Sequence, residues 1–451
     1  MCGIVGIVSE DSNLHLINEM VSELSHRGPD YRDVIFHENC ALGHTRLSIL
    51  DLSENANQPL TSENGRYTII FNGEIYNHFE IRNSILSHVK FKSTSDTETL
   101  LYGFIEKGAE ILNYLNGIFA FAIIDKIAGE LYIARDQFGV KPLYYFENGC
   151  EFYFSSEIKA LNKLPNLNQS IDYDSLAKYI NFLYSPDETT PFKAIKKLPP
   201  GFYINYKVNK RKLVLTQYYD IPFDGTIKKA SLPQMTIELE QYLIKAVERQ
   251  LLSDVPIGFF LSGGLDSSLI VAIAKKLRPK MTFDCFTVDY SNGQIKSEGF
   301  EDDLFYAQLL SQKLGLNLNI VKAEIDIVKD FDKMIWFLDE PQADPAPLNV
   351  FNISKAARDK GIKVLLGGTA GDDVFSGYRR HQALNLEKYI FLLPSFIWSF
   401  LNRLSKNLNL SKPAFRRLRK FLNESNKTKL DRMAGYFAWL PYEDNLGLFS
   451  K

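Results

Sequence analysis

Residues 256–277 read PIGFFLSGGLDSSLIVAIAKKL, and this stretch decides the architecture of the second half of the chain. An apolar run, PIGFFL, leads through a glycine-rich turn into helical periodicity over residues 267–277. Glycines let backbone N–H groups approach an anion closely, and the N-terminus of a helix adds the positive end of its dipole. The stretch therefore predicts a strand, a turn and a helix arranged around a phosphate-bearing ligand.

The segments on both sides of this unit repeat the alternation of helix and apolar strand. Short apolar strands that alternate with helices are typical of a parallel sheet covered by helices on both faces. We therefore expect an α/β parallel-sheet domain over residues 230–451. Its strands are expected at residues 281–290, 318–323 and 363–368, and its helices at 233–250, 302–314 and in segments up to 360.

The first half of the chain follows a different pattern. Many short β-type runs are bounded by turns and separated by helical stretches, which is typical of a strand-rich α+β domain. We expect this domain over residues 2–215, and the polar, Pro- and Gly-containing residues 222–232 as the linker. The expected strands cover residues 3–8, 67–73, 117–125, 129–136, 141–146, 151–156, 202–208 and 212–221, and the expected helices 13–24, 80–86, 96–107 and part of 170–200.

Composition excludes several classes of protein. The 52 Lys and Arg residues nearly balance the 54 Asp and Glu residues, which argues against a nucleic-acid coat or a strongly basic membrane-surface protein. The four cysteines, Cys2, Cys40, Cys150 and Cys285, are scattered without a CxxC pair, so neither a disulfide framework nor a zinc ribbon is indicated. The chain has no signal peptide at its start and no apolar run long enough to span a membrane. We expect a cytoplasmic enzyme that acts on small molecules, and a homodimer is one assembly that stays open.

A second apolar segment lies towards the end of the chain. Residues 389–401, YIFLLPSFIWSFL, are too short for a membrane span and contain Pro394, so we expect a buried or groove-lining helix. The basic stretch that follows, residues 403–420, is expected to be a solvated helix face, with binding to a membrane surface as the alternative.

Cys2 follows the initiator Met1 directly. A small residue at this position allows removal of the methionine, which would place a thiol and a free α-amine on one residue. The α-amine has a reference pKa of about 8 and can act as general base for its own thiol. The alternative is a cysteine buried in a strand, which is a common place for a free cysteine.

Five further residues could complete a site for an amino-acid amide around this thiol. Asn72 and Gly73, in the sequence FNGEI, offer an amide and a backbone N–H as an oxyanion hole for acyl transfer. Arg46 can clamp an α-carboxylate with two hydrogen bonds, and Glu74 and Asp96 can pair with an α-ammonium. The structural alternatives are a turn at Asn72-Gly73, a surface ion pair for Arg46 and a helix N-cap for Asp96.

Across residues 2–205 the motifs resemble, in order, the class II glutamine amidotransferase domain of asparagine synthetases. The segments that carry the resemblance are MCGIVGI, HRGPD, GHTRLSILDLS, FNGEIYN, SDTETLL, LNGIFAFAIID, ARDQFGVKPLYY and FSSEIKAL. The resemblance implies an αββα sandwich of the N-terminal nucleophile (Ntn) hydrolases that hydrolyses glutamine through a glutamyl thioester. The residues that it implies are Cys2 as nucleophile, Asn72 and Gly73 as oxyanion hole, and Arg46, Glu74 and Asp96 as glutamine-binding residues.

The turn of the second domain resembles a further family motif. Residues 262–268, SGGLDSS, resemble the PP-loop of the ATP pyrophosphatases (adenine nucleotide α-hydrolase-like), which cleave ATP between its α and β phosphates. A kinase-type P-loop is the weaker interpretation because its Lys is missing, and a tight turn capped by Ser is the structural alternative. Segments at residues 286–289 (FTVD), 339–345 (DEPQADP) and 367–378 (GGTAGDDVFSGY) fit the same family. The resemblance implies ATP bound by Leu261, Ser262, Gly263, Gly264, Asp266, Ser267, Ser268, Val288, Gly367 and Gly368, with Asp266 and Asp372 as Mg²⁺ ligands.

Two departures from asparagine synthetases concern the acceptor of the amide. Thr369 stands where that family has an acidic residue, and a threonine carries no charge at neutral pH. Residues 344–352, DPAPLNVFN, lack the Thr-Arg element expected to hold the α-carboxylate of aspartate. Related synthetases continue well past residue 451, so we expect a ligase domain that is truncated here.

The leading hypothesis is therefore glutamine-dependent, ATP-driven amidation of aspartate to asparagine through an acyl adenylate, with release of AMP and pyrophosphate. One alternative keeps this chemistry and changes the acceptor, for example to a sugar acid of a cell-surface polysaccharide. The other is a glutaminase whose synthetase half is defunct.

Overall fold

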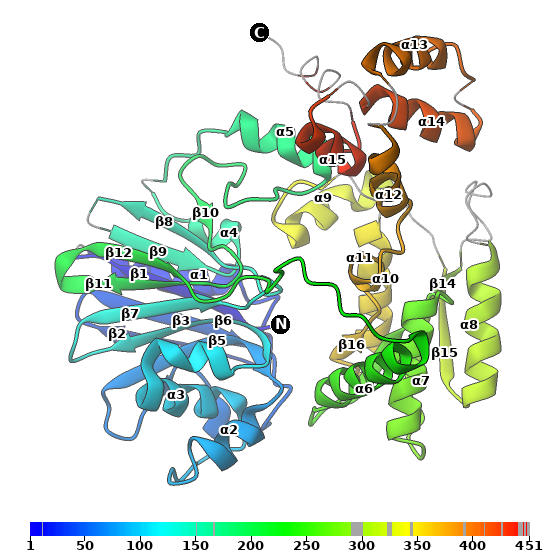
Figure 1. Cartoon of the computed structure of the whole chain (residues 1–451). Coiled ribbons are helices and arrows are strands. Elements are labelled where there is room, and N and C mark those ends of the chain that lie inside the picture. The colour runs from blue at the N-terminus through cyan, green and yellow to red at the C-terminus, as the bar shows by residue number, and fades with distance from the viewer. Residues whose placement is uncertain are drawn as a thin grey trace.

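The computed structural model extends over residues 1–451 (Figure 1). It describes all of them except residues 11, 150, 166, 290–300, 323–326, 343–345, 391–393, 410, 425–426, 441–444, 446–447 and 449–451. Cys150 and residues 343–345 of the DEPQADP segment, both singled out in the sequence, lie outside the described residues.

Two six-stranded antiparallel sheets form the first domain. The first has the strand order β10-β8-β9-β1-β3-β2, with β1 Gly3–Val8, β2 Tyr31–His37, β3 Cys40–Arg46, β8 Tyr144–Asn148, β9 Glu151–Ser155 and β10 Lys196–Lys197. The second has the order β12-β11-β7-β6-β5-β4, with β4 Leu60–Thr61, β5 Tyr67–Ile75, β6 Gly117–Asp125, β7 Glu130–Arg135, β11 Phe202–Lys207 and β12 Lys212–Gln217.

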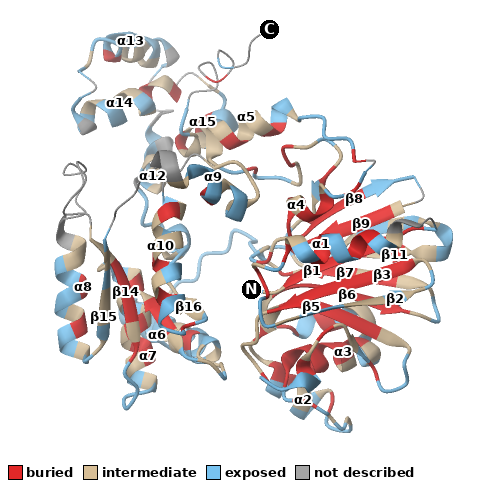
Figure 2. Ribbon diagram, turned by 180° about the vertical axis from the view of Figure 1, so that it is seen from behind, coloured by how far each residue is buried: buried red, intermediate tan, exposed pale blue. Residues whose placement is uncertain are grey.

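The two sheets pack face to face, and each carries helices on its outer face (Figures 1 and 2). Between the sheets lies a core of aromatic and aliphatic side chains that includes Ile70, Phe154 and Tyr206. The outer faces are covered by α1 (Ile17–Glu23) and α4 (Ile158–Leu161) on the first sheet, and by α2 (His78–Ser84) and α3 (Asp96–Lys107) on the second. This αββα sandwich confirms the fold predicted for the first domain.

Strand β5 shows how the alternation of side chains positions the later site. Ile69 and Phe71 face the helices α2 and α3, whereas Ile70 faces the core between the sheets. Successive side chains of a strand point to opposite faces. Asn72 and Glu74 therefore share the face of Ile70 and point towards the sheet that contains β1.

Strands β2 and β3 were not among the expected strands, although β3 lies next to β1 in the middle of its sheet. All seven residues of β3, CALGHTR, are buried, and four of them are Gly or polar. A strand buried on both faces lacks the alternation by which a half-exposed strand is recognised. Because of its Gly and polar residues, β3 was not recognisable as a strand from the sequence.

The second domain is built on the parallel sheet β15-β14-β13-β16, as predicted. Helices α6, α7 and α8 cover one face around Phe259 and Cys285, and α10 covers the other around Phe286. Residues 218–231 between β12 and α6 contain no helix or strand. The strands are β13 Ile257–Phe260, β14 Asp284–Asp289, β15 Asn317–Lys322 and β16 Val364–Leu366, and the helices are α6 Leu232–Gln250, α7 Leu265–Leu277, α8 Glu301–Leu314, α9 Ile327–Leu338, α10 Ala346–Asp359 and α11 Gly371–Val374.

Helices near the end of the chain pack beside α5 (Tyr173–Phe182), a helix of the first half (Figure 1). Of the two alternatives predicted for residues 389–401, the buried helix is wrong, because the side chains of Phe396 and Phe400 are 71% and 61% exposed. Among the described residues, no helix is both long and apolar enough to cross a membrane. The helices of this end are α12 Arg379–Ile390, α13 Ser395–Ser405, α14 Pro413–Glu424 and α15 Lys429–Phe437, and of these α14 and α15 lie next to α5.

Candidate functional site

A narrow pocket lies where the two sheets of the first domain meet the loop after β3. Its free volume is about 30 Å³, which is the room of about one water molecule. Five of the six predicted residues of the amidotransferase site line it, together with main-chain and side-chain groups of residues 47–58. These five are Cys2, Arg46, Gly73, Glu74 and Asp96.

The backbone N–H of Gly73 points towards this pocket. Gly73 lies inside β5, not in a turn, and it is paired with Phe119 of β6. In antiparallel sheets, hydrogen-bonded and non-hydrogen-bonded residue pairs alternate along the strands. Tyr76 donates its N–H to Asn116, so this pair is hydrogen-bonded. Gly73 lies three residues earlier in β5, so its pair with Phe119 is one that is not hydrogen-bonded. The neighbouring N–H groups on the same edge, of Phe71 and Ile75, donate to the side chains of Gln58 at 2.6 Å and Asp96 at 2.8 Å. The N–H of Gly73 lies between them, with no acceptor among the described residues, as an oxyanion donor requires.

Asn72 is fully buried, and neither atom of its side-chain amide has a hydrogen-bond partner among the described residues. A buried amide without partners costs free energy, so such groups are rare unless they have a function. Asn72 shares the face of β5 that points towards β1, at whose start Cys2 lies. Its unsatisfied N–H₂ group is therefore available as a second oxyanion donor.

Arg46 ends strand β3 and is buried, so it does not form the surface ion pair that was its structural alternative. Nη1 donates to Ser53 O at 3.0 Å and to Asn57 Oδ1 at 2.6 Å. Nη2 donates to the carbonyls of Leu50 and Asp51. Four of the five N–H groups of the guanidinium thus hold the segment after β3, and a two-bond clamp on a carboxylate requires this segment to release Arg46.

Glu74 and Asp96 place two carboxyl groups at the pocket. Burial raises the pKa of Asp96 to about 6, and burial together with the nearby Asp96 raises the pKa of Glu74 well above its usual value. An α-ammonium would stabilise the charged form of both. Asp96 is the first residue of α3 but not its cap, because Ser95 accepts from the N–H of Glu98 in that role.

The thiol of Cys2 lies next to the main chain of Leu47. Its Sγ accepts from the Leu47 N–H at 3.4 Å and is 3.8 Å from the Leu47 carbonyl, which accepts the thiol proton. Burial is the largest influence on the thiol and raises its pKa, while the nearby N-terminal amine lowers it. The amine belongs to Met1 in this structure, and burial lowers its pKa to about 5. Cys2 precedes β1, so it is not the strand cysteine of the alternative interpretation, whereas Cys40 and Cys285 are buried in strands.

Two residues near the pocket were missed in the sequence. Gln58 lines it and binds the Phe71 N–H, and Lys141 is buried close enough to Cys2 and Glu74 to influence the pKa of both. Burial lowers the pKa of the Lys141 ammonium. Lysine is rarely buried without a function or a partner, but only the fold shows that the KPLYY segment is interior.

The SGGLDSS turn forms the start of helix α7 in the second domain. The Ser262 Oγ lies 3.0 Å from the Ser267 Oγ and accepts from the Gly264 N–H at 3.3 Å. Gly263 has a φ of +81°, which favours glycine. Ser262 thus closes the turn between β13 and α7, in line with the structural alternative of a tight turn held by Ser. No side chain caps α7 at its N-cap residue Gly264, so the N–H groups of the first helical turn remain available to a ligand.

The segment at residues 367–378 lies against this turn. A Cβ at Gly371 would be 2.3 Å from the Asp266 Oδ2, and one at Gly368 would be 2.7 Å from the Ser267 nitrogen, so both positions need glycine. Asp372 follows directly and is exposed, as is Thr369. Oxygen ligands of this kind suit Mg²⁺, which usually keeps several waters and binds substrate phosphates, so the two aspartates fit the ion although no cluster of three acidic, His or Cys groups occurs among the described residues.

Other predicted members of the nucleotide site are more buried. Leu261 donates its N–H to Phe286 O at 2.8 Å and is fully buried, Val288 is partly buried in β14, and Gly367 packs against Phe260. Asp339 and Glu340 of the DEPQADP segment instead contact the first domain, through Lys159 and Lys197. Asp339 and Glu340 thus lie at the interface between the domains.

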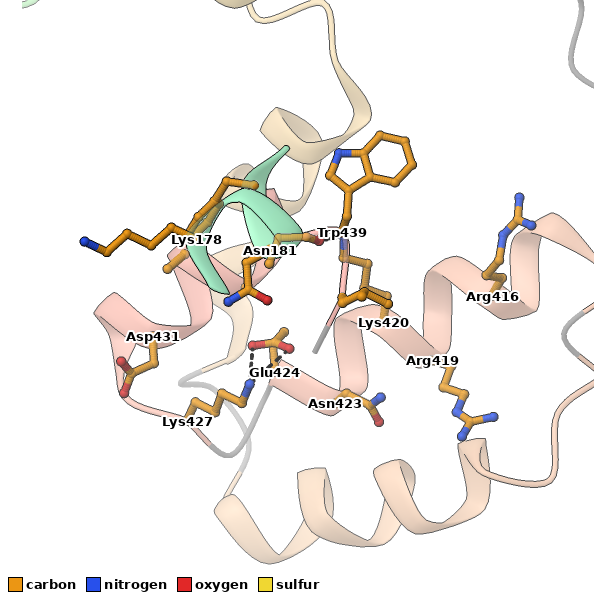
Figure 3. Close-up of a pocket in the computed structure, with 15 residues that line it drawn as sticks. Lys178, Asn181, Arg416, Arg419, Lys420, Asn423, Glu424, Lys427, Asp431 and Trp439 are labelled. Atoms are coloured by element: carbon orange, nitrogen blue, oxygen red, sulfur yellow. Dashed lines mark hydrogen bonds and ion pairs between the residues drawn. The ribbon is translucent and has the colours of Figure 1, made fainter. Parts of the chain in front are cut away.

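A larger pocket lies elsewhere. It has a volume of about 820 Å³ between α5 and the helices α14 and α15, and it shares no residue with the Cys2 pocket or the SGGLDSS turn. Figure 3 shows its mixed lining of basic, acidic and apolar side chains. The labelled ones are Lys178, Asn181, Arg416, Arg419, Lys420, Asn423, Glu424, Lys427, Asp431 and Trp439.

Comparison with known proteins assigns each half of the chain to a family model. A model described as glutamine amidotransferase domain matches residues 1–219, and one described as asparagine synthase matches residues 238–444. Asparagine synthetase 1 (glutamine-hydrolyzing) of Bacillus subtilis is 34% identical over 386 residues, which cover 84% of this chain and 59% of that protein. A Methanocaldococcus jannaschii protein with the provisional name asparagine synthetase 2 (glutamine-hydrolyzing) is 31% identical over 448 residues, which cover 92% of this chain and 84% of that protein.

The chain thus spans about three fifths of the length of the Bacillus relative. Among solved structures, glutamine phosphoribosylpyrophosphate amidotransferase of Bacillus subtilis with ADP and GMP aligns at a TM-score of 0.39 and 14% identity, covering 82% of this chain and 91% of that chain. A likeness this distant carries no argument, and the fold rests on the strand order described above.

Proposed function

Because the chain belongs to the family of glutamine-hydrolysing asparagine synthetases, we propose that it transfers the amide nitrogen of glutamine to a carboxylate in an ATP-driven reaction. The first domain hydrolyses glutamine to glutamate and ammonia. The second joins a carboxylate to the AMP moiety of ATP, releasing pyrophosphate, and ammonia then displaces AMP to form the amide. These steps consume one glutamine, one ATP and one water.

In the first half-reaction, the Cys2 thiolate attacks the side-chain amide carbon of glutamine. The oxyanion that forms accepts from the Gly73 N–H and from the Asn72 amide, ammonia leaves, and water hydrolyses the thioester. After removal of Met1, the α-amine of Cys2 serves as the base. The observation that carries this proposal is a pair of unpartnered donors on adjacent residues of β5. The Gly73 N–H lies at the pocket of the thiol, and the Asn72 amide is buried beside it, outside the lining of that pocket.

Binding of glutamine requires the pocket to widen. Its present volume is that of about one water, and residues 50–57 occupy the Nη groups of Arg46. We propose that this segment releases Arg46 when the α-carboxylate of glutamine arrives, while Glu74 and Asp96 bind the α-ammonium. We therefore expect the loop after β3 to move when glutamine binds.

In the second half-reaction, the open N-terminus of α7 and the hydroxyls of Ser262 and Ser267 bind the phosphates of ATP. Asp266 and Asp372 would hold Mg²⁺, which neutralises phosphate charge in such sites. Val288 lies near the carboxyl end of β14, and Gly367 directly follows β16. These two strands flank β13, and their carboxyl ends form the edge where ligands of parallel sheets bind.

Aspartate is the acceptor proposed first, because the relatives are named asparagine synthetases. A different carboxylate is the second candidate, and the exposed, uncharged Thr369 favours it. A threonine there cannot provide the carboxylate that asparagine synthetases have at this position.

The test is to incubate the purified chain with glutamine, aspartate and Mg-ATP and to measure glutamate, asparagine and pyrophosphate. Equal amounts of asparagine and pyrophosphate are expected, with at least as much glutamate. Glutamate without asparagine would refute aspartate as acceptor, and a screen of other carboxylates by pyrophosphate release would then separate the second candidate from a ligase half without activity. Absence of glutamate would refute the proposal for Cys2.

A further inference from the structure

A row of charged side chains connects the main chain of Cys2 with the second domain. Arg27 donates from Nε to the carbonyl of Cys2 at 2.8 Å and from Nη1 to Glu157 Oε1 at 2.6 Å. Arg27 comes from the HRGPD segment, and Glu157 follows β9. The peptide carbonyl of the nucleophile is thus held by a guanidinium that is itself fixed by a carboxylate.

Glu157 binds three cationic or titratable partners at once. Its Oε2 pairs with Lys159 Nζ at 2.5 Å and lies 3.0 Å from His26 Nε2, while Oε1 pairs with Arg27. Burial by itself raises the pKa of Glu157, but its hydrogen bonds and the surrounding positive charges prevail and hold the pKa at about 2. Glu157 therefore stays ionised and keeps Arg27 and Lys159 in one geometry.

Lys159 carries the row across the domain interface. Its Nζ pairs with Asp339 Oδ1 at 3.3 Å and lies 4.5 Å from the centre of the Trp336 ring. The His26 ring contacts the same Trp336, with ring centres 4.6 Å apart. Trp336 belongs to α9, and Asp339 comes directly after this helix, so both contacts belong to the second domain.

Asp339 makes this contact from a left-handed backbone conformation at the end of α9. Its φ is +66°, which is unfavourable for a non-glycine residue. In this conformation its carboxylate accepts the backbone N–H groups of Ile158 and Lys159. The next residue, Glu340, accepts from the Tyr144 hydroxyl at 3.0 Å and pairs with Lys197 at 3.1 Å. Two consecutive acidic residues of the second domain are thus bound by the first.

The row differs from the other ion pairs between the domains by its burial. The side chains of Arg27, Glu157 and Asp339 are each 5–7% exposed. In the pair between Arg249 and Glu80, by contrast, the Glu80 side chain is 64% exposed. Removal of one member of a buried ion pair leaves an uncompensated charge, whereas an exposed pair contributes little.

We propose that Glu157, Lys159 and Asp339 are positioning residues that couple the second domain to the nucleophile, so that Cys2 is fully active only while Asp339 is bound to Lys159. They touch neither glutamine nor the reacting atoms and act through Arg27 on the Cys2 peptide. The inference rests on the proposed role of Cys2 in glutamine hydrolysis. It adds that this activity, although all its proposed residues lie in the first domain, depends on a carboxylate of the second.

The test compares Asp339→Asn with Glu80→Gln, which breaks the exposed pair, in the full chain. We expect Asp339→Asn to lower kcat for glutamine hydrolysis at least fivefold with KM changed less than twofold, and Glu80→Gln to change neither. Glu157→Gln should lower kcat as well, and the double variant with Asp339→Asn should be no slower than the slower single variant, because both act through one row. Lys159→Arg should restore the activity that Lys159→Gln loses. Equal kcat in wild type and Asp339→Asn, or multiplying effects in the double variant, would overturn the proposal.

A second measurement does not require turnover. The rate at which iodoacetamide alkylates Cys2, followed by mass spectrometry of the N-terminal peptide, should change at least threefold in Asp339→Asn and stay constant in Glu80→Gln. If the wild type hydrolyses no glutamine but its alkylation depends on Asp339, the coupling holds and the proposed function fails. If alkylation is the same in both variants, the coupling fails whatever the glutaminase activity. Lys159→Gln replaces Asp339→Asn in both measurements should the latter not fold.

Discussion

The two candidate sites differ in how completely they are built before a substrate binds. The site around Cys2 is buried, and its donors are fixed by the ladder of β5 and β6. The site around the SGGLDSS turn is open, with Ser262, Thr369 and Asp372 exposed to solvent. In the first site the oxyanion donors are in place, although the loop after β3 must still release Arg46, whereas the second site lacks the charges that ATP and Mg²⁺ would bring. We therefore expect changes at the thiol and the oxyanion donors of the first site to act on catalysis, and changes at Asp96 and in the second site to act on binding.

The largest effect is expected from Cys2→Ala. Without the thiol no thioester forms, so glutamine hydrolysis should fall by about 10³-fold or more. Formation of the product amide from added ammonia and ATP should be retained, because the second site is separate. Glutamate release and amide formation from ammonium chloride measure the two activities. Cys40→Ala, a buried cysteine outside the pocket, is the matched control and should keep both; loss of ammonia-dependent synthesis in Cys2→Ala would show that the sites are not separable.

Asn72→Leu should lower kcat for glutamine hydrolysis by about 10²-fold, the usual effect of removing one oxyanion donor. KM should change little, since the donor acts on the oxyanion and not on the bound amide. Stability should stay the same or rise by up to about 2 kcal/mol, because the substitution removes a buried amide that has no partner among the described residues. Urea unfolding and steady-state kinetics test the two parts. A strongly destabilised variant would mean that Asn72 is a structural residue.

How far the sequence predicted these sites follows from the physics of each. Motifs near glycine turns were located well, because the turn at residues 262–268 and the start of α3 at Asp96 depend on local residues. The Asn72-Gly73 pair was interpretable either as a turn or as a site, and only its pairing with β6 shows that it lies in a strand. The residues around Asn72 and Gly73 do not indicate which strand pairs with this part of the chain.

Long-range contacts were the part that could not be predicted. Arg46 was assigned to a carboxylate clamp, but its bonds to the segment after β3 follow from the path of that segment. Asp339 was noted as part of a nucleotide-site motif, yet its partners lie about 180 residues earlier in the chain. A charge in a sequence indicates that a partner exists without indicating which one, so the docking of the domains required the structure.

In the open site, Gly371→Ala should weaken ATP binding about tenfold and leave glutamine hydrolysis unchanged. The added Cβ would be 2.3 Å from the Asp266 Oδ2, so the carboxylate must move away from its place against Gly371. A tenfold loss of affinity corresponds to about 1.4 kcal/mol, which is the size expected when one hydrogen bond to a charged group is lost. Calorimetric titration with Mg-ATP measures it. Val374→Ala, at a 73% exposed position of the same short helix, should bind ATP as the wild type does. Equal affinity in both variants would remove Asp266 from the site.

The smallest effect on activity is expected from Asp96→Asn, which should weaken glutamine binding but stabilise the fold. Burial raises the pKa of Asp96 from 3.8 to about 6, so the folded protein favours the protonated form. A raised carboxyl pKa stabilises the fold fully below pH 4, and this contribution is lost as the pH rises through 6. At pH 7.5 the variant should therefore be more stable than wild type by up to about 3 kcal/mol, with no difference at pH 4.

The Asp96→Asn substitution should weaken the binding of glutamine. The ionised carboxylate attracts the α-ammonium, so KM for glutamine in the wild type should fall as the pH rises from 5 to 7. In Asp96→Asn, KM should be about fivefold higher at pH 7.5 and nearly independent of pH across that range. Asp174→Asn, an exposed carboxyl in α5, should show the wild-type profile. If Asp96→Asn is more stable but keeps the pH dependence of KM of the wild type, the charge of Asp96 destabilises the fold without contributing to glutamine binding. Glu74 alone would then bind the α-ammonium.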